Sequence, residues 1–290
     1  MIVVQELIVS ALLSPHERRG RGPGGMPENG EVVEPVNVAE VQLWLAQLDE
    51  VDAYGLERFS AWFTPAERTQ FSGFLSERRR REFIVGRGLA RQALACEYSV
   101  APELFEFVAD PQGKLSISAP TSARATSFNI SHTADWVACG ICRKFEIGLD
   151  VERIAPRVEP LLIAERFFDE NEVRELSALH DPTRLERFFA LWTLKEALAK
   201  AHGLGLSAPL HASRFEISAD GTFDAASAYS HFRQGAWLGL TSLTPQHRLA
   251  ICVLCDETID VRIAIHSTQP NTHAFTSGLT WVHGRLRNSI

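Results

Sequence analysis

The chain has 290 residues, of which 45% are hydrophobic and 22% are charged. This is the composition of a globular protein with room for one large domain or two modest ones. The formal net charge of −7 argues against a general nucleic-acid binder, because neutralising phosphates requires a basic surface.

The first 35 residues show neither a helical nor a strand period. The apolar run from Met1 to Leu13 is interrupted by polar side chains, lacks a basic leader and is too short to cross a bilayer. The stretch from Ser14 to Pro35 is rich in Gly, Pro and charge, which predicts disorder. Within this stretch, Met26 directly follows the Gly/Pro patch of residues 20–25 and offers an alternative translation start. We therefore expect a disordered extension over residues 1–35, with no membrane span and no secretory signal.

Residues 36–145 carry the pattern of a first α+β lobe. An amphipathic or extended stretch from Val38 to Leu48 opens it. Thr64 followed by Pro65 indicates a capped helix start, and the long stretch after Ser76 is helical in character with one strongly basic end. The predicted helices are Pro65 to Phe74 and Glu77 to Tyr98, and the predicted strands are Phe105 to Val108, Leu115 to Ile117 and Trp136 to Cys142.

Residues 146–260 carry the pattern of a second α+β lobe. The predicted helices are Pro160 to Phe167, Asn171 to Leu179 and Leu185 to Ala201, and the predicted strands are Arg214 to Ile217, Ala236 to Leu240 and Arg248 to Cys255. The segment Trp136 to Glu152 is similar to His247 to Ile263, which suggests two related α+β lobes. The tail 261–290 has no clear period, and we expect it to be poorly ordered.

An acidic pair lies on one predicted strand. Residues 147–152 read IGLDVE, and side chains two apart on a strand point to one face, so Asp150 and Glu152 converge. Two carboxylates on one face can hold a hard cation. Such pairs also occur on solvated strand faces, so the pair alone does not decide the matter.

A second charged group lies on a predicted helix. The segment from Trp192 to Lys200, WTLKEALAK, is apolar nearly all round apart from Lys195, Glu196 and Lys200. Such a helix is buried, so its charged side chains need partners. Glu196 and Lys200 also stand in the order that favours a helix salt bridge, which is the simpler interpretation.

Taken together, these two segments resemble the signature of the Sfp-type 4′-phosphopantetheinyl transferase superfamily. That signature reads (V/I)G(V/I/L)D, a gap, then (F/W)(S/C/T)xKE(A/S) and a lysine. Further segments resemble the family's motifs in the family's order: Gln112 to Lys114 (GKP), Phe128 to His132 (FNISH), Glu165 to Phe168 (KRFF) and Gly203 to Leu206 (the loop after the signature helix). Leu115 stands where the family usually has proline.

The resemblance implies an α+β fold of two lobes related by a pseudo-two-fold axis, with coenzyme A in the cleft between them. It implies that Asp150, Glu152 and Glu196 bind Mg²⁺. Glu196 is implied to be the general base, directly or through a water, and Lys200 to stabilise the leaving phosphate.

Contacts with coenzyme A are implied in the same way. Ser131 and His132 resemble the family's phosphate contacts, with Lys114 as a second basic contact. Arg68 and Arg87 are candidates for binding the 3′-phosphate, although arginines on helices are also common on solvated faces. The basic residues near the first helix are placed differently from those of the best-known members.

The implied activity is that of a holo-carrier-protein synthase. Such an enzyme moves 4′-phosphopantetheine from coenzyme A onto a serine of an acyl or peptidyl carrier protein and releases adenosine 3′,5′-bisphosphate. No motif marks the pathway, which can be that of a fatty acid, a polyketide or a nonribosomal peptide. Two related lobes in one chain imply a monomer. Two alternatives stay open: another magnesium-dependent transferase that uses coenzyme A, and a silent relative that binds coenzyme A or a carrier as a scaffold.

Five cysteines, an odd number, indicate a reducing cytoplasm rather than a disulfide framework. The pairs Cys139-x-x-Cys142 and Cys252-x-x-Cys255 superficially match a zinc site. Both pairs lie in apolar strands, where residues three apart face opposite sides, so we expect no zinc.

Overall fold

The computed structural model describes residues 38–155, 159–205, 208–218, 222–227, 235–268 and 279–288. The predicted disordered extension, residues 1–35, lies outside these described residues. All described residues belong to one unit, Val36–Ile290. No helix in the described ranges is both long and apolar enough to cross a membrane.

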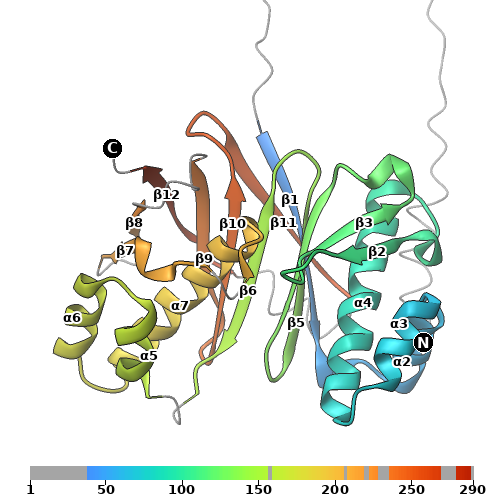
Figure 1. The fold of residues 1–290 in the computed structure, drawn as a ribbon, viewed down its shortest axis with the longest axis horizontal. Helices are drawn as coiled ribbons and strands as arrows, with labels where there is room; N and C mark the ends of the chain where they lie inside the picture. Colours follow the sequence, from blue (N-terminus) through green and yellow to red (C-terminus); the bar gives the residue numbers. More distant parts are fainter. Residues whose placement is uncertain are drawn as a thin grey trace, which may run out of the picture. The chain divides into compact units, whose positions relative to one another are not determined.

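In the described residues, the β structure consists of two mixed sheets and a small hairpin (Figure 1). The first sheet has the order β11-β1-β5-β4, the second β6-β10-β9-β12-β8-β7, and the hairpin pairs β2 with β3. The strands are β1 Val38–Gln47, β2 Glu106–Ala109, β3 Leu115–Ala119, β4 Ser127–His132, β5 Trp136–Cys142, β6 Ile147–Arg153, β7 Ser213–Ile217, β8 Phe223–Ser227, β9 Ala236–Thr244, β10 His247–Leu254, β11 Asp260–Ser267 and β12 Val282–Asn288.

Helices cover one face of each sheet, and the α+β class is therefore confirmed. The α-helices are α2 Ala53–Ala61, α3 Pro65–Ser72, α4 Glu77–Tyr98, α5 Pro160–Phe167, α6 Glu170–Ala178 and α7 Thr183–Ala201. Short 3-10 helices are η1 Leu48–Glu50, η2 Pro102–Leu104, η3 Thr121–Ala123 and η5 Leu210–Ala212. The long helices α4 and α7 start and end close to the predicted bounds.

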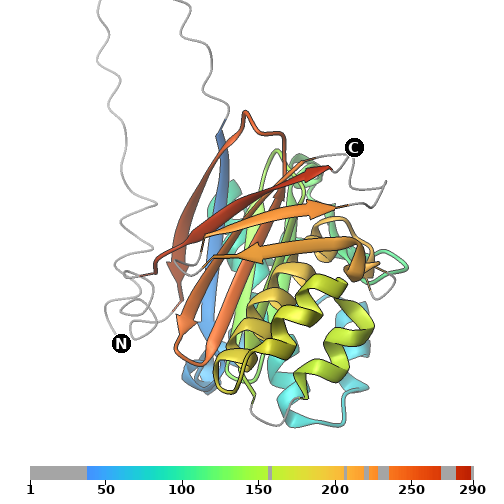
Figure 2. The same ribbon diagram turned by 90° about the vertical axis from the view of Figure 1, so that its left-hand side faces the viewer.

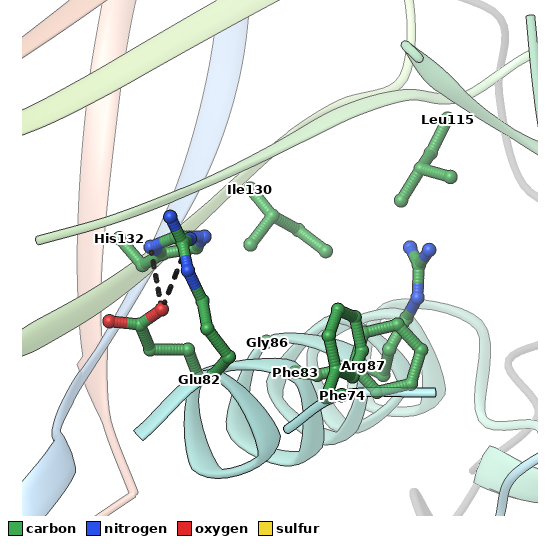
Figure 3. Close-up of a pocket in the computed structure, with 9 residues that line it drawn as sticks. Phe74, Glu82, Phe83, Gly86, Arg87, Leu115, Ile130 and His132 are labelled. Carbon is green, nitrogen blue, oxygen red and sulfur yellow. Dashed lines mark hydrogen bonds and ion pairs between the residues drawn. The ribbon is translucent and has the colours of Figure 1, made fainter. Parts of the chain in front are cut away.

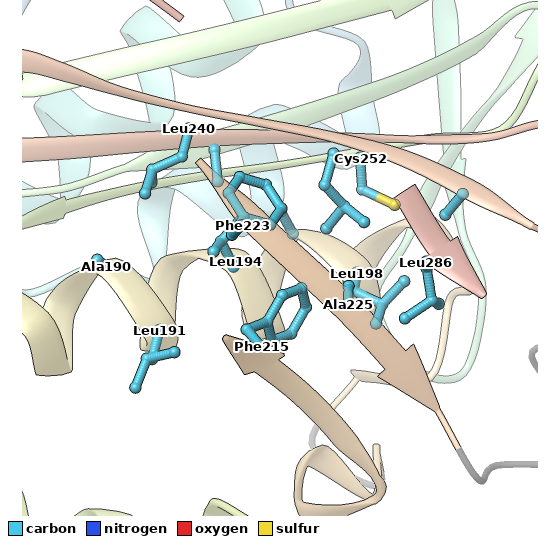
Figure 4. Packing of buried hydrophobic residues seen from close by; sticks show 14 of the residues in the cluster. Ala190, Leu191, Leu194, Leu198, Phe215, Phe223, Ala225, Leu240, Cys252 and Leu286 are labelled. Carbon is cyan, nitrogen blue, oxygen red and sulfur yellow. The ribbon is translucent and has the colours of Figure 1, made fainter. Parts of the chain in front are cut away.

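Three apolar clusters form the core. One lies between α4 and the first sheet and contains Phe59, Leu89 and Phe128. A second lies between α7 and the second sheet, where Leu194 and Phe215 pack together (Figure 4). The third is formed by side chains of β1, β5, β6, β9 and β10, so the two sheets bury their remaining faces against each other. The helices consequently lie outside and the sheets inside, as Figures 1 and 2 show.

Each lobe contains a similar buried ion pair, which supports the relation between the two lobes. In the first lobe, Arg91 of α4 is fully buried, pairs with Glu67 at 2.6 Å and donates to the carbonyl of Phe105 at 3.1 Å. In the second, Lys195 of α7 is buried and pairs with Glu172 at 2.8 Å. Glu67 and Glu172 are each the third residue of a capping box on the preceding short helix. One cation thus ties the same elements together in each lobe.

The first sheet takes one strand, β11, from the far end of the second lobe's chain segment. After β5 in the first sheet, the chain crosses to form β6 in the second sheet, and after β10 in the second sheet it crosses to form β11 in the first. In the first sheet, β11 runs parallel to β1, and Val38 of β1 lies beside Asp260 of β11. The similar segments Trp136 to Glu152 and His247 to Ile263 are these two crossings.

The tail predicted to be poorly ordered, residues 261–290, contributes two strands instead. β11 pairs with β1, and β12 lies between β9 and β8. That prediction is wrong for these strands because their partners are far away in sequence and leave no local period. The expected boundary between lobes also changes, since β11 belongs to the first sheet.

Removing residues 279–290 should destabilise the protein, because β12 joins β8 to β9. Leu286 is 2% exposed, and a side chain on Gly284 would lie 2.3 Å from the Phe223 carbonyl oxygen, so the strand is closely seated. We expect a Tm lower by roughly 10 °C, since the ladder and a buried leucine are lost. Thermal unfolding measures this, with a chain lacking only residues 289–290 as the control. An unchanged Tm would show that β12 adds nothing to the sheet.

The two sheets meet where β4 faces β6, and side chains replace a backbone ladder there. Alternate residues on and after β4 accept hydrogen bonds from alternate amides of β6. The pairs are Ser127 Oγ with Ile147 N (3.1 Å), Asn129 Oδ1 with Leu149 N (2.9 Å), Ser131 Oγ with Val151 N (3.2 Å) and Thr133 Oγ1 with Arg153 N (3.1 Å). This side-chain ladder fixes the register of β6, and hence of its acidic residues, against the first lobe.

Candidate active site where the two lobes meet

Gly148 brings strand β6 against helix α7. A Cβ atom at this position would lie 2.0 Å from the carbonyl oxygen of Ala197 and 2.3 Å from the amide nitrogen of Ala201. Only glycine leaves room for the helix backbone to come this close. The glycine therefore places the side chains of β6 within reach of those on α7.

Asp150 and Lys200 form an ion pair across this contact. Lys200 Nζ lies 2.5 Å from Asp150 Oδ1, and Ser131 Oγ lies 3.0 Å from the same oxygen. Asp150 is only 3% exposed, and its other oxygen, Oδ2, is buried without a hydrogen-bond partner among the described residues. Burial alone would lower the pKa of Lys200, but Asp150 and the carboxylates of Glu196 and Glu152 raise it above its usual value.

Glu152 and Glu196 complete the acidic group. Trp192 Nε1 donates to Glu152 Oε1 at 3.2 Å, and the indole ring stacks against Phe168 and Phe188. Burial raises the pKa of Glu152 to about 7, and repulsion from Asp150 adds to this rise. Burial also raises the pKa of Glu196, with Lys200 opposing the rise and Asp150 adding to it. Glu152 can therefore take up a proton near neutral pH, and the pKa of Glu196 is shifted in the same direction.

The stability of the metal-free protein should fall as Glu152 ionises. Its pKa in the folded chain, about 7, lies above the ordinary value of 4.5, so the fold favours the protonated form. The resulting stabilisation is complete below the ordinary pKa and is lost as the pH rises through the folded one. We expect Glu152→Gln to remove this dependence, so that wild type loses more Tm than the variant between about pH 5 and about pH 8. Thermal unfolding in a chelator measures it, and parallel curves would contradict the assignment.

The carboxylates can be tested for their fit to a divalent cation. In the described ranges, no three His, Cys, Asp or Glu side chains are already arranged so that they could hold a metal ion. The donors are nevertheless of the right kind, since Mg²⁺ prefers a few carboxylate oxygens together with water and phosphate. Asp150 Oδ2 is buried and has no hydrogen-bond partner in the described part of the chain, and two further carboxylates with raised pKa values lie beside it. A cation here would offset the repulsion between Asp150 and these two carboxylates, so the residues fit such an ion.

A pocket of about 210 Å³ lies on the first lobe between α4 and β4 (Figure 3). Its lining residues are Phe74, Arg79, Glu82, Phe83, Gly86, Arg87, Leu115, Ile130 and His132. Burial lowers the pKa of His132; Glu82 opposes this, whereas Arg79 and Lys200 add to it. Ser131, which precedes His132 on β4, donates to Asp150 of β6, so the pocket adjoins the acidic group.

Glu82 organises the polar side of this pocket. It is 4% exposed and accepts from Arg78 Nε at 2.8 Å and from Arg79 Nη1 at 3.4 Å, while His132 Nδ1 lies 3.6 Å away. Sequence reasoning missed this role, because the run of arginines was interpreted only as a strongly basic end of the helix. A glutamate at i+3 and i+4 from two arginines is the signal that could have found it.

The predicted coenzyme A contacts are not all brought together. His132 and Arg87 line the pocket, and Ser131 lies beside Asp150 and Lys200. Arg68, on α3, donates to the carbonyl of Ala61 at 3.3 Å and is not among the pocket's lining residues. Lys114 is held at the end of α7.

The ammonium group of Lys114 has two structural partners. Its Nζ lies 2.6 Å from Glu146 Oε2 and 2.8 Å from the carbonyl oxygen of Ala201. It thus binds the C-terminal end of α7, where a cation is favourable. Lys195 is engaged in the same manner, since it donates to the carbonyl of Leu210 at 2.9 Å in addition to pairing with Glu172. Lys195, which also donates to the carbonyl of Ser213, uses all three of its N–H groups, whereas these two contacts of Lys114 use two of its three.

Comparisons with known proteins agree with this geometry. Residues 146–252 match the model of the 4′-phosphopantetheinyl transferase superfamily, a range that holds β6, α7 and β10. The 4′-phosphopantetheinyl transferase Sfp of Bacillus subtilis is 29% identical over 68% of this chain and 84% of its own length. HetI of Nostoc sp. is 31% identical over 58% of this chain and 70% of its own length.

A third relative, a putative 4′-phosphopantetheinyl transferase of Synechocystis sp., is 30% identical over 59% of this chain and 68% of its own length. The residues matched by the family model, 146–252, include the strand with Asp150 and the helix with Glu196. This chain therefore belongs to the Sfp-type 4′-phosphopantetheinyl transferases.

Proposed function

We propose that this protein transfers the 4′-phosphopantetheine arm of coenzyme A to a serine hydroxyl of an acyl or peptidyl carrier protein, with Mg²⁺ as cofactor. One observation supports this most: Gly148 lets β6 and α7 approach so closely that Asp150, Glu152, Glu196 and Lys200 converge beside a basic pocket. Family membership supplies the reaction class, and the arrangement of these side chains suits it.

The pocket on the first lobe is the proposed site for the nucleotide end of coenzyme A. Arg79, Arg87 and His132 offer cationic or donor groups for phosphate, and Phe83 supplies an apolar wall. Arg87 lies over the Phe83 ring at 5.2 Å, which holds its guanidinium at the pocket. The pyrophosphate would then reach Lys200, which acts electrostatically on His132.

Asp150, Glu152 and Glu196 would hold Mg²⁺, with Asp150 Oδ2 as the oxygen that has no partner in the described residues. The chemistry that the ion supplies when bound is neutralisation of charge on the pyrophosphate. The indole of Trp192 holds Glu152 in place by its hydrogen bond to Oε1. Trp192 is itself fixed by aromatic neighbours, so Glu152 has little freedom to turn away.

The transfer step balances with the residues present. A bond forms between the carrier's serine oxygen and the β-phosphorus, and the bond from that phosphorus to the oxygen bridging to the α-phosphate breaks. Glu196, whose pKa is raised by burial, accepts the serine proton, either directly or through a water. Lys200 donates to the oxygen that leaves with adenosine 3′,5′-bisphosphate, and its positive charge stabilises that group.

The proposed partners are carrier proteins or domains of fatty acid, polyketide or nonribosomal peptide synthesis, and the proposed location is the cytoplasm, with the enzyme acting as a monomer. The test is intact mass spectrometry of apo carriers from each pathway, incubated with the protein, coenzyme A and Mg²⁺. A gain of one phosphopantetheine group that a chelator prevents would support the proposal and rank the carriers. No gain on any carrier, with folded protein, would favour a scaffold that binds coenzyme A without transferring it.

A further inference from the structure

Helix α4 and strand β4 come together where Glu82 faces His132. Side chains two apart on a strand share a face, so Ile130 and His132 both point from β4 toward α4, and both line the pocket (Figure 3). On α4, Gly86 makes the approach close, because a Cβ atom there would lie 3.3 Å from Ile130 Cγ2. Glu82 lies one helical turn before Gly86, which places its carboxylate beside the His132 ring.

Two arginines hold the Glu82 carboxylate in place. Arg78 Nε donates to Oε1 at 2.8 Å, and Arg79 Nη1 donates to Oε2 at 3.4 Å. A buried carboxylate is stable only with such partners, and donors on both oxygens keep it from turning. The His132 ring is a further partner, which a salt bridge within the helix does not require. Its Nδ1 lies 3.6 Å from Oε2, within ion-pair range.

The position of this carboxylate determines how His132 can use its two ring nitrogens. A carboxylate so close to Nδ1 favours a proton on that atom. The other nitrogen, Nε2, makes no hydrogen bond with the residues that the structure describes. When Nε2 also takes a proton, the ring becomes a cation with a donor left over for an anion.

Glu82 is also the charge that favours this cationic form of the ring. It raises the pKa of His132, whereas burial, Arg78 and Arg79 of α4, and Lys200 of α7 all lower it. Without Glu82, every remaining influence of the described residues would favour a neutral ring. A neutral ring with its proton on Nδ1 offers Nε2 only as an acceptor, which a phosphate oxygen repels.

We infer that Glu82 is a positioning residue for phosphate binding. It holds His132 at the pocket with Nδ1 toward α4, so that Nε2 can donate to a phosphate of the nucleotide end of coenzyme A. This inference rests on the proposed function, because the ligand of the pocket is the one given there. Loss of the Glu82 charge should weaken the binding of coenzyme A and leave turnover at saturating coenzyme A nearly unchanged.

Glu97 offers a matched control on the same helix. Its Oε1 lies 2.5 Å from Arg143 Nε, and Arg143 directly follows β5, so this ion pair also joins α4 to the first sheet. Glu97 is not among the residues that line the pocket. Glu97→Gln therefore removes the same charge and a comparable ion pair without touching the proposed ligand site.

The experiment compares full-length wild type, Glu82→Gln, Glu97→Gln, His132→Ala and the double variant Glu82→Gln/His132→Ala. Calorimetry gives Kd for coenzyme A and for adenosine 3′,5′-bisphosphate, and carrier modification gives kcat. For Glu82→Gln we expect both Kd values to rise roughly 10-fold, the size of one hydrogen bond to a charged group, with kcat within about twofold of wild type. Glu97→Gln should match wild type in all three. In the His132→Ala background, Glu82→Gln should raise Kd by less than about threefold.

The ring of His132 can be observed directly by nitrogen NMR, with His132→Ala to assign its signals. In wild type the neutral ring should carry its proton on Nδ1, a result that needs no variant of Glu82. In Glu82→Gln the pKa of His132 should fall, because the carboxylate that stabilises the cation is gone. A wild-type ring with its proton on Nε2, or an unchanged pKa in the variant, would overturn the inference.

The binding data can overturn it independently. Unchanged Kd values in Glu82→Gln, or a rise that Glu97→Gln matches, would show that Glu82 only stabilises the fold. A full loss in the His132→Ala background would show that Glu82 does not act through His132. If wild type modifies no carrier, the proposed function fails, and the Kd values still decide: weaker binding of both ligands in Glu82→Gln than in Glu97→Gln supports the role of Glu82, and no binding of either to wild type overturns it.

Discussion

Replacing Glu196 with glutamine should abolish most transfer and leave the fold intact. Glutamine keeps the volume and the helix propensity of glutamate but cannot accept the serine proton. Among the described residues, the Glu196 side chain interacts with Lys200 and Asp150 through charge alone, so glutamine leaves no hydrogen-bond partner of this side chain unsatisfied. We expect kcat lower by roughly 100- to 10 000-fold, the range for loss of a general base, with Tm nearly unchanged.

The matched control for this variant is Glu186→Gln on the same helix. Glu186 lies at the other end of α7, where its carboxylate is 4.0 Å from Arg248. It loses the same charge without touching the acidic group, so its turnover should equal that of wild type. Carrier modification followed by mass spectrometry measures both variants. Activity of Glu196→Gln within about tenfold of wild type would remove Glu196 from the role of base.

Gly148→Ala should be the most damaging single change to the fold. The added Cβ would meet backbone atoms of α7, at 2.0 Å from Ala197 O and 2.9 Å from Ala201 Cα, and backbone cannot give way as a flexible side chain can. The helix would have to move off β6, which opens the apolar cluster beneath it (Figure 4). We expect the free energy of unfolding to fall by more than about 4 kcal/mol, which would appear as a large drop in Tm or in soluble yield.

The control is Gly73→Ala, at the end of α3. There the nearest atom to the added Cβ is Gln70 O at 3.4 Å, an ordinary contact, and φ is −78°, which any residue adopts. Its Tm should match that of wild type. Because displacement of α7 also separates Lys200 from Asp150, the folded fraction of Gly148→Ala should be inactive. A soluble, active Gly148→Ala protein with wild-type Tm would show that α7 does not approach β6 this closely.

Local signals predicted much of the framework and failed where partners are distant. Helix α4 was predicted from Glu77 to Tyr98, and Ser76 does cap it by accepting from Arg79 N. Helix α2 was missed because Gly55 disfavours a helix, although Asp52 caps it. Strands β11 and β12 were missed because each exists only through pairing with strands far along the chain. Propensity acts over neighbours, whereas strand pairing does not.

Some features of the candidate site were also predicted from the sequence, and others were not. Strand alternation predicted that Asp150 and Glu152 share a face, and the buried helix was expected to need partners for its charges, which Lys195 and Lys200 have. The sequence could not say that Lys195 and Lys114 serve structure while Lys200 faces the acidic group. That choice depends on which carbonyls and carboxylates lie opposite each lysine, such as Ala201 O for Lys114.

The return of β11 to the first sheet bears on how the protein unfolds. Separating the lobes would take β11 from β1, so the first sheet cannot stay complete once the lobes part. The central apolar cluster is likewise shared between the sheets. The lobes are therefore coupled in one cooperative transition, and the acidic group of one lobe and the pocket of the other appear and disappear together.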